Sequence, residues 1–337
     1  ENPGKRIFLL SEMIHNPAVN DDLVRNGIRF IMDTEGNHYL PWEEITPDDV
    51  VIIPAFGTTV EIMEMLNARG VDLLTYNTTC PFVEKVWKRS GEIGRQGFSV
   101  LIHGKNKHEE TRATFSHSYR HAPSLVLRDM SEAHMVGAMM RNEISVQAFL
   151  DAFAGKYSDG FDPQRDLIRV GVVNQTTMLA IETQAIADYF RQVMTELHGD
   201  DYKNYFADTR DTLCYATNDN QEAALALRDC RADLAMVIGG YNSSNTSQLV
   251  TILKEKMPTY FVRDEQEILD RDRLQHYDYH SRNLQSTSGW LPGSGPVKIA
   301  LGSGASCPDS IVDAVIDKLL GFFEVTTTRE EVLARLS

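Results

Sequence analysis

The feature that most constrains the fold of this 337-residue chain is an alternation repeated seven times along it. Each time, a short apolar run leads into a polar loop, which leads into a stretch with helical spacing of apolar residues. The runs with their loops cover residues 6–16, 50–59, 71–80, 99–110, 167–177, 234–247 and 297–306. Continuous apolar strands that alternate with helices are typical of parallel sheets covered on both faces. The sequence therefore predicts an α/β protein.

Seven units exceed what one small sheet holds comfortably, so we expect several small α/β domains. We place them at residues 1–79, 80–207 and 208–296, with a strand and helix at 297–337 that return to the first domain. Residues 140–166, which include AFAGKYSDGFDPQRD, are interpreted as an insertion in the second domain. Residues 262–296 also interrupt the alternation.

Charge and cysteine content narrow the class of protein. A net charge of −15 argues against bulk attraction to nucleic acid or to an anionic membrane. No apolar run approaches the ~20 residues of a membrane span. Four cysteines are too few for a disulfide framework in a chain of this length, which indicates a reducing compartment. We therefore expect no nucleic-acid or membrane partner and a cytoplasmic location, with the plastid stroma left open.

The segment VIGGYNSSNTSQL, residues 237–249, sets six hydroxyl or amide side chains between an apolar run and an apolar helix. Ligands of open α/β sheets bind beyond the carboxyl ends of the strands, where the next helix offers free N–H groups and a positive dipole end. Such groups suit a phosphate. The alternative is helix N-capping, which Ser, Thr and Asn provide routinely. Six such residues exceed what one cap uses.

Two cysteines are expected at helix starts. Cys80 directly precedes Pro81, which favours the first helical position, so Cys80 is expected at the N-cap. Cys214 is expected to follow a strand and to precede a helix that starts near Asn218. A thiol at a helix start forms a thiolate readily, which indicates a metal or redox site. The alternative is two buried and inert cysteines, since no C-x-x-C pair is present.

Histidines and carboxylates follow two other strands. HGKNKHEET contains His103, His108, Glu109 and Glu110, which could bind an anion and deliver a proton. His15, in EMIHNP, stands at another strand end. A zinc hydrolase built on His103, His108 and cysteines is a possible alternative, but it lacks a compact ligand motif. GSGASC at 302–307 imitates a dinucleotide fingerprint but lacks its third glycine, so we reject a nicotinamide site there.

Seven motifs in this order resemble the 4-hydroxy-3-methylbut-2-enyl diphosphate reductase family: EMIHNP, TTCPFVEKVW, HGKNKHEET, NQTTM, LCYATNDNQEA, GGYNSSNTSQL and SGASCPD. The resemblance covers essentially the whole chain, and the short segments PAFGTT and KVW are similar to those of the plant and cyanobacterial branch. It implies a trefoil of three small α/β domains with mainly parallel sheets around a central cavity. It also implies a [4Fe–4S] cluster held by three cysteine thiolates, which leaves one iron open to the substrate's hydroxyl. Two electrons and protons remove that hydroxyl, giving isopentenyl and dimethylallyl diphosphate.

The resemblance assigns roles to individual residues. It implies that Cys80 and Cys214 are cluster ligands, that Glu110 is the proton-delivering acid, and that Thr176 lies beside the substrate hydroxyl. The residues implied for the diphosphate cradle are His15, His108, Ser243, Ser244, Asn245 and Ser306. The implied partners are the diphosphate substrate and a ferredoxin or flavodoxin-type electron donor.

The chain departs from the family pattern at two places. Phe56 in PAFGTT stands where many bacterial members have a histidine, so no ligand role is carried over to it. The family's first cluster cysteine lies in a Gly-Phe-Cys segment, which we expect upstream of Glu1. We therefore expect the sequence as given to hold little or no four-iron cluster unless that cysteine is supplied. A second hypothesis is a cluster-free relic that binds a diphosphate but does not reduce it.

Overall fold

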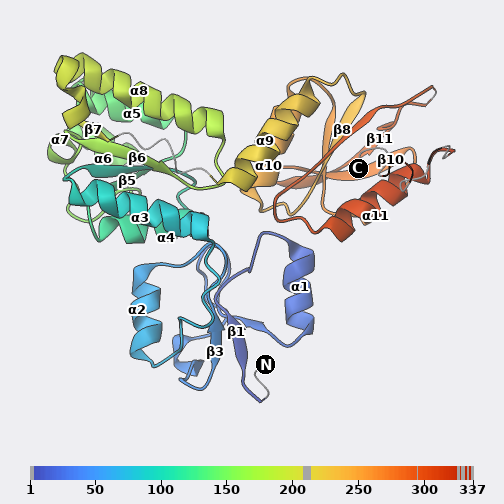
Figure 1. The fold of residues 1–337 in the computed structure, drawn as a ribbon, viewed down its shortest axis with the longest axis horizontal. Helices are drawn as coiled ribbons and strands as arrows, with labels where there is room; N and C mark the ends of the chain where they lie inside the picture. The colour runs from blue at the N-terminus through green and yellow to red at the C-terminus, as the bar shows by residue number, and fades with distance from the viewer. Residues whose placement is uncertain are drawn as a thin grey trace. The chain divides into compact units, whose positions relative to one another are not determined.

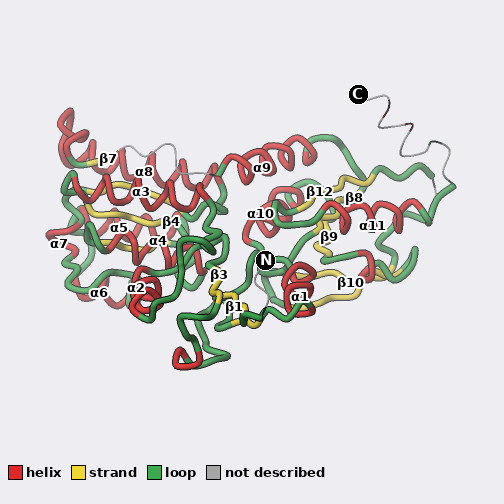
Figure 2. Tube along the Cα trace, turned by 60° about the horizontal axis from the view of Figure 1, so that its bottom comes forward, coloured by secondary structure: helices red, strands yellow, loops and turns green. Residues whose placement is uncertain are grey.

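The computed structural model describes residues 4–207, 214–293 and 295–324, together with the single residues 327, 331 and 334. The chain divides into two compact units, Glu1–Asn218 and Asp219–Ser337. Helix α9 (Tyr215–Arg228) spans the boundary between them. Strands alternate with helices through most of both units, as predicted (Figure 2).

The first unit begins with a three-stranded parallel sheet. Strand β1 (Ile7–Leu9) lies between β2 (Arg29–Phe30) and β3 (Val50–Ile52). Helices α1 (Pro17–Arg25) and α2 (Val60–Ala68) lie on opposite sides of it (Figure 1), and a short 3₁₀ helix, η1, covers Trp42–Glu44. Its core consists of apolar side chains from the strands and from α2, among them Phe8, Leu10, Ile31, Val51, Ile53 and Leu66.

The prediction of a strand within residues 71–80 is wrong, because this segment forms only an isolated bridge, between Ile53 and Asn77. The carboxylate of Asp72 accepts hydrogen bonds from the backbone N–H groups of Leu74 and Thr75, both at 3.1 Å. This local turn satisfies backbone donors that a strand would have paired with a neighbour.

A four-stranded parallel sheet completes the first unit. Its order is β5 (Ser124–Leu127), β4 (Ser99–His103), β6 (Val170–Asn174) and β7 (Phe206–Ala207). Helices α3 (Pro81–Arg95) and α4 (Glu109–Tyr119) cover one face, and α5 (Met130–Met140) and α8 (Ala180–His198) the other (Figure 1). Every residue of β4 is buried, as a central parallel strand requires. A 3₁₀ helix, η2 (Gly199–Asn204), follows α8.

Residues 140–166 are part of the packed core. They contain α6 (Val146–Ala152) and α7 (Pro163–Asp166). Phe149, Phe153 and Phe161 from this segment are buried with strand residues Leu125 and Leu127 in one apolar cluster. The segment therefore stabilises the second sheet.

The second unit is built on another three-stranded parallel sheet, with β8 (Leu234–Ile238) between β12 (Ile299–Ser303) and β9 (Thr259–Val262). Helices α10 (Ser244–Lys254) and α11 (Asp309–Leu320) pack against it. An antiparallel hairpin of β10 (Arg273–Asp278) and β11 (Asn283–Ser288), preceded by the 3₁₀ helix η3 (Glu265–Glu267), explains the interrupted alternation at 262–296.

We expected the strand and helix of residues 297–337 to return to the first domain. For the strand, β12, this prediction is wrong. β12 pairs with β8 over its whole length, from Ile299 opposite Leu234 to Ser303 opposite Ile238. A long parallel neighbour satisfies the backbone groups of β12 within this sheet, so the strand belongs to the second unit.

The three parallel sheets share one topology. In each, the first strand in the chain is central or next to central, the second lies on one side of it, and the third lies on the other. The strand order therefore reverses at β1/β3, at β4/β6 and at β8/β12. Such reversals leave a crevice at the carboxyl ends of the two strands, where ligands of open α/β sheets bind. Within the described residues, no helix is long and apolar enough to cross a membrane.

Candidate functional site

The β1/β3 reversal holds His15 and Phe56. His15 lies in the loop between β1 and α1, where Asn16 caps the helix by accepting a hydrogen bond from the Ala18 N–H at 3.1 Å. Phe56 lies in the loop after β3 and stacks on the His15 ring, with centroids 4.2 Å apart and planes inclined by 23°. His15 is buried, at 6% exposure. The imidazole therefore has a fixed aromatic wall on one face.

The β4/β6 reversal holds His108, Glu110 and Thr176. His108 is the N-cap of α4, and its Nδ1 accepts a hydrogen bond from the Glu110 N–H at 3.2 Å. Across the crevice, Thr176 follows β6 and donates to the Glu110 carboxylate through both its backbone N–H and its hydroxyl, the latter at 3.0 Å. Gln175 ties the two loops together, since its Oε1 accepts from the Lys105 N–H at 3.0 Å.

The two reversals of the first unit meet at their histidines. The Nε2 atoms of His15 and His108 are 3.1 Å apart, and the two rings meet edge to face. Burial is the largest cause that holds the pKa of His108 well below its ordinary value, and the nearby His15 is the second largest. His108 is therefore neutral in this arrangement.

Two adjacent carboxyl groups at the start of α4 are buried. Burial raises the pKa of Glu110 to about 7, although the hydrogen bonds from Thr176 lower it. Burial also raises the pKa of Glu109 to about 8, against a hydrogen bond from the Ser11 hydroxyl. A carboxyl group whose pKa lies near neutrality can carry a proton and release it at physiological pH. This matches the direction that desolvation predicts for Glu110.

Cys80 and Cys214 both lie at helix starts. Cys80 is the N-cap of α3, as predicted, and its thiol makes no capping hydrogen bond. Cys214 directly precedes α9, which begins at Tyr215, so the expected start near Asn218 is three residues too late; the strand expected before it falls on residues 208–213, outside the described part. The aromatic rings of Phe82 and Tyr215, which follow the two cysteines closely, are 4.9 Å apart. The two helix starts are therefore neighbours.

The donor set fits part of an iron–sulfur site. A cluster with one open iron needs three thiolates, and Cys80 and Cys214 supply two half-buried thiols without a disulfide. Cys230 is exposed near the end of α9. Cys307 packs against the apolar core of the second unit, and burial raises its pKa to about 11, which disfavours a thiolate.

A zinc site is not formed by the described residues. They contain no group of three His, Cys, Asp or Glu side chains that could hold a metal ion. His103, which the zinc alternative requires, is fully buried in β4, and its Nδ1 lies 2.8 Å from the Thr183 hydroxyl. Burial lowers the pKa of His103 to about 4. His103 is a neutral core residue.

The β8/β12 reversal of the second unit holds the Ser- and Asn-rich segment. Ser243 is the N-cap of α10, and its hydroxyl accepts from the Thr246 N–H at 3.2 Å, so the capping explanation is correct for this residue. Ser244 and Asn245 in the first turn are buried, yet Ser244 Oγ and Asn245 Nδ2 have no hydrogen-bond partner among the described residues. Buried polar groups are normally paired, so these two donors are available for a ligand.

Asn245 connects the two sides of this crevice. Its Oδ1 accepts from the Ala305 N–H at 2.9 Å, beside the half-buried Ser306 that follows β12. Asn220 reaches the same region from α9, with its Nδ2 at 3.4 Å from Asn245 Oδ1. Because Asn245 Oδ1 accepts these hydrogen bonds, the Nδ2 end of the same amide points away from Ala305 and Asn220.

Tyr241 fixes the start of the same loop. Its hydroxyl donates to the Glu267 carboxylate, and its ring stacks on Tyr277 of the hairpin, with centroids 4.2 Å apart. The hairpin at 273–288 therefore holds the polar loop in place. Sequence reasoning did not single out Tyr241, Glu267 or Asn220, since nothing local in the sequence shows which distant side chains they meet.

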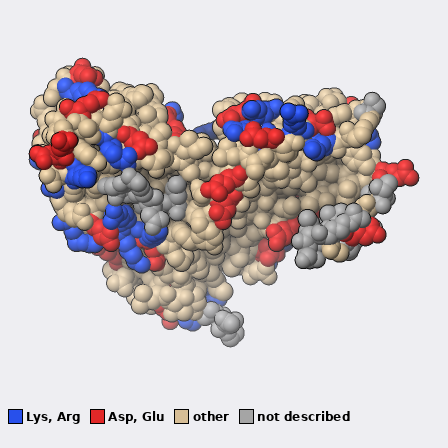
Figure 3. Space-filling view, turned by 45° about the horizontal axis from the view of Figure 1, so that its top comes forward, with Lys and Arg blue, Asp and Glu red and all other residues tan. Residues whose placement is uncertain are grey.

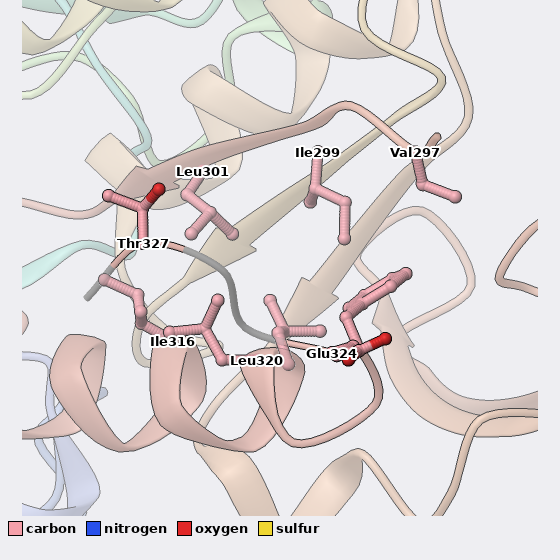
Figure 4. A pocket seen from close by; sticks show the side chains of 9 residues that line it. Val297, Ile299, Leu301, Ile316, Leu320, Glu324 and Thr327 are labelled. Carbon is pink, nitrogen blue, oxygen red and sulfur yellow. The ribbon is translucent and has the colours of Figure 1, made fainter. Parts of the chain in front are cut away.

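An apolar cavity of about 370 Å³ in the second unit is not the site. It lies between β12 and α11 and is lined mainly by aliphatic side chains, including Ile299, Leu301, Ile316 and Leu320 (Figure 4). It offers no cluster of donors for an anion and no thiol. The surface also offers no single basic face in the view of Figure 3, where acidic and basic side chains are intermixed.

Comparison with known proteins agrees with this architecture. The sequence pattern of the LytB protein family matches residues 1–320. The chain is 39% identical over 320 residues to a reductase from Gloeobacter violaceus, covering 94% of this chain and 75% of the relative. It is 40% identical over 332 residues to one from Synechococcus sp. (strain RCC307), covering 98% and 79%. Both relatives are 4-hydroxy-3-methylbut-2-enyl diphosphate reductases.

Solved structures show the same fold. The Plasmodium falciparum E-1-hydroxy-2-methyl-but-2-enyl-4-diphosphate reductase matches with a TM-score of 0.65 at 18% identity, over 94% of this chain and 79% of that one. A second structure, of the terminal enzyme of the non-mevalonate pathway, matches with a TM-score of 0.53 at 24% identity, over 94% and 89%. These likenesses confirm the α/β fold with three parallel sheets expected of the trefoil proteins. The chain is thus an α/β protein of the LytB class. It belongs to the family of 4-hydroxy-3-methylbut-2-enyl diphosphate reductases.

Proposed function

We propose that this chain reduces 4-hydroxy-3-methylbut-2-enyl diphosphate to isopentenyl and dimethylallyl diphosphate, the last step of the non-mevalonate route. Two electrons and two protons are consumed, the carbon–oxygen bond of the hydroxyl breaks, and the oxygen leaves as water. The observation that carries this proposal is the buried Glu110 carboxyl, which is paired with Thr176 and lies two residues after His108, one partner of the His15–His108 contact. It sets a proton source next to groups suited to an anion.

The diphosphate is held by side-chain donors and by helix starts. His15 and His108 lie at the first two reversals, and Ser243, Ser244, Asn245 and Ser306 at or beside the third. Buried donors such as Ser244 Oγ and Asn245 Nδ2 are fixed before the ligand arrives, so their hydrogen bonds cost little reorganisation. That both sets face one diphosphate in a central cavity stays a prediction.

Glu110 delivers a proton to the reacting end of the substrate, and Thr176 orients it. The Thr176 hydroxyl donates to Glu110 Oε2 at 3.0 Å, which fixes the direction of the carboxyl group. A group with a pKa of about 7 is partly protonated at neutral pH, so it can give up a proton during turnover.

The family's cofactor is a [4Fe–4S] cluster, and Cys80 and Cys214 are the residues that would hold it here, together with a third thiolate. When bound, the cluster supplies the electrons and an open iron for the substrate's hydroxyl. This chain's own residues orient the diphosphate and hold the proton. A ferredoxin or flavodoxin-type protein is the proposed electron donor, and the proposed location is cytoplasmic.

The test is anaerobic reduction of 4-hydroxy-3-methylbut-2-enyl diphosphate by the cluster-loaded protein, expressed with any residues that its gene encodes before Glu1. A low-potential chemical reductant replaces the natural donor, and the products are separated by chromatography. We expect both isomeric diphosphates. Binding of the substrate without any product would favour the cluster-free diphosphate-binding relic instead.

A further inference from the structure

Phe56 packs against both histidines that are proposed to contact the diphosphate. Its ring stacks on His15, with centroids 4.2 Å apart and planes inclined by 23°, and it meets the His108 ring edge to face with centroids 5.6 Å apart. The two imidazoles meet each other edge to face as well, with centroids 5.0 Å apart. The three rings therefore form a closed cluster in which each ring contacts the other two.

Phe56 fixes the imidazoles without competing for their nitrogens. A phenyl ring has no hydrogen-bonding group, so it covers one face of His15 and leaves the ring nitrogens to other partners. Because the phenyl ring is stacked on this face, tilting the imidazole toward that side brings it into Phe56. The Nε2 atoms of His15 and His108 lie 3.1 Å apart. Two ring nitrogens held this close together can meet oxygens of one phosphate group.

The loop of residues 54–59 is itself held by backbone hydrogen bonds. The Gly57 N–H donates to the Pro54 carbonyl oxygen at 2.9 Å, which closes a turn at the tip of the loop. The Cys80 N–H donates to the Ala55 carbonyl oxygen, also at 2.9 Å. The loop is therefore tied to the start of α3 as well as to its own turn.

A second pair of stacked rings holds the same loop from α3 and α4. Trp87 of α3 stacks on His117 of α4, with centroids 3.7 Å apart and planes inclined by 8°. His117 Nε2 lies 3.2 Å from the carbonyl oxygen of Thr58, to which it donates. A Cβ atom at Gly57, whose φ is +73°, would overlap the Trp87 ring. Only glycine therefore lets the indole pack against this turn.

One helix connects the two halves of this arrangement, because α4 carries His117 and also has His108 as its N-cap. We propose that Phe56 is a positioning residue for substrate binding, which holds the His15 and His108 rings in place before the diphosphate arrives. The stack of Trp87 on His117 keeps Phe56 there. The inference rests on the proposed function, because it assumes that both histidines contact the diphosphate. It adds that affinity depends on a ring that has no hydrogen-bonding group of its own.

The experiment compares Phe56→Leu with wild type, in cluster-loaded protein expressed with any residues that its gene encodes before Glu1. Leu keeps an apolar side chain but loses the flat ring that both imidazoles contact. Binding must then order a side chain that was fixed in advance. We expect calorimetry to show that isopentenyl diphosphate binds about 2- to 10-fold more weakly. In the reduction assay, KM should rise by a similar factor while kcat stays within about twofold of wild type, because the lost interaction acts on binding.

Three further variants separate the ring from overall stability. Phe56→Tyr keeps the six-membered ring and should bind as wild type. Phe30→Leu removes a half-buried ring from β2 in the same unit and should also bind as wild type, whatever its effect on the melting temperature. Trp87→Leu removes the stack on His117 and should raise KM in the same direction as Phe56→Leu.

The outcomes distinguish this inference from the proposed function. Binding of isopentenyl diphosphate by Phe56→Leu as tight as by wild type would overturn the inference alone. The same holds if Phe30→Leu weakens binding equally, or if Phe56→Leu lowers kcat without raising KM. A wild-type protein that neither binds a diphosphate nor reduces the substrate would overturn the proposed function as well.

Discussion

Replacing Asn245 by Asp tests the diphosphate cradle while leaving the local structure intact. The Asn245 Oδ1 accepts the Ala305 N–H at 2.9 Å, and an aspartate oxygen can do the same. The Nδ2 group has no partner among the described residues and is the atom proposed to donate to the diphosphate. In Asn245→Asp this donor becomes an acceptor that carries negative charge. The position lies in the first turn of α10, where the helix dipole tolerates a carboxylate.

The expected effect follows from one hydrogen bond. A charge-assisted bond contributes about 1.5–3 kcal/mol, which corresponds to about 10- to 150-fold in the dissociation constant, and like-charge repulsion adds to the loss. Asn245→Ala removes the acceptor as well and breaks the hydrogen bond from the Ala305 N–H, so it should also lower the free energy of unfolding by about 0.5–1.5 kcal/mol.

Calorimetry with isopentenyl diphosphate and thermal melting of the same samples measure the two effects. Asn283→Asp, at an exposed position of the hairpin in the same unit, is the control for the added charge. If Asn245→Asp binds as tightly as wild type while Asn245→Ala only loses stability, Asn245 serves the loop and the capping explanation holds for the whole segment.

Three further outcomes are expected. Because the pKa of Glu109 in the folded protein is about 8, above its ordinary 4.5, the stability that it contributes is present below pH 4.5 and lost as pH rises to about 8. The loss is on the order of a few kcal/mol, so melting temperatures between pH 5 and 9 should fall more steeply for wild type than for Glu109→Gln. Thr176→Val removes a hydrogen bond to the ionised Glu110, so the pKa of Glu110 should rise. The alkaline limb of the profile of kcat against pH should therefore move to higher pH. In protein expressed with any residues that its gene encodes before Glu1, Cys80→Ser and Cys214→Ser should each lose most of the iron bound after anaerobic reconstitution, whereas Cys230→Ser should retain it; equal iron in all three would remove the first two as ligands.

Much of the fold follows from local patterns in the sequence. The apolar runs before His15, His108 and Asn245 form strands because they are long enough and apolar on both faces. The residue Pro81 fixes the start of α3 and hence the position of Cys80. Short strands such as β2 and β7, with two residues each, carry no pattern that could be recognised.

The contacts that define the site could not be derived from local pattern. The meeting of His15 with His108 depends on how loops from two different sheets pack, 93 residues apart in sequence. The pairing of β12 with β8 is likewise a long-range choice, which periodicity does not encode.

The most direct test of the account is the effect of Glu110→Gln on reduction and binding measured in the same cluster-loaded preparation. Gln keeps the size of the side chain and can still accept from Thr176, but it has no proton to deliver. We predict that kcat falls by about 100-fold or more, while isopentenyl diphosphate binds within a few-fold of wild type. Turnover near the wild-type rate would contradict the assignment of the buried Glu110 carboxyl as the proton source.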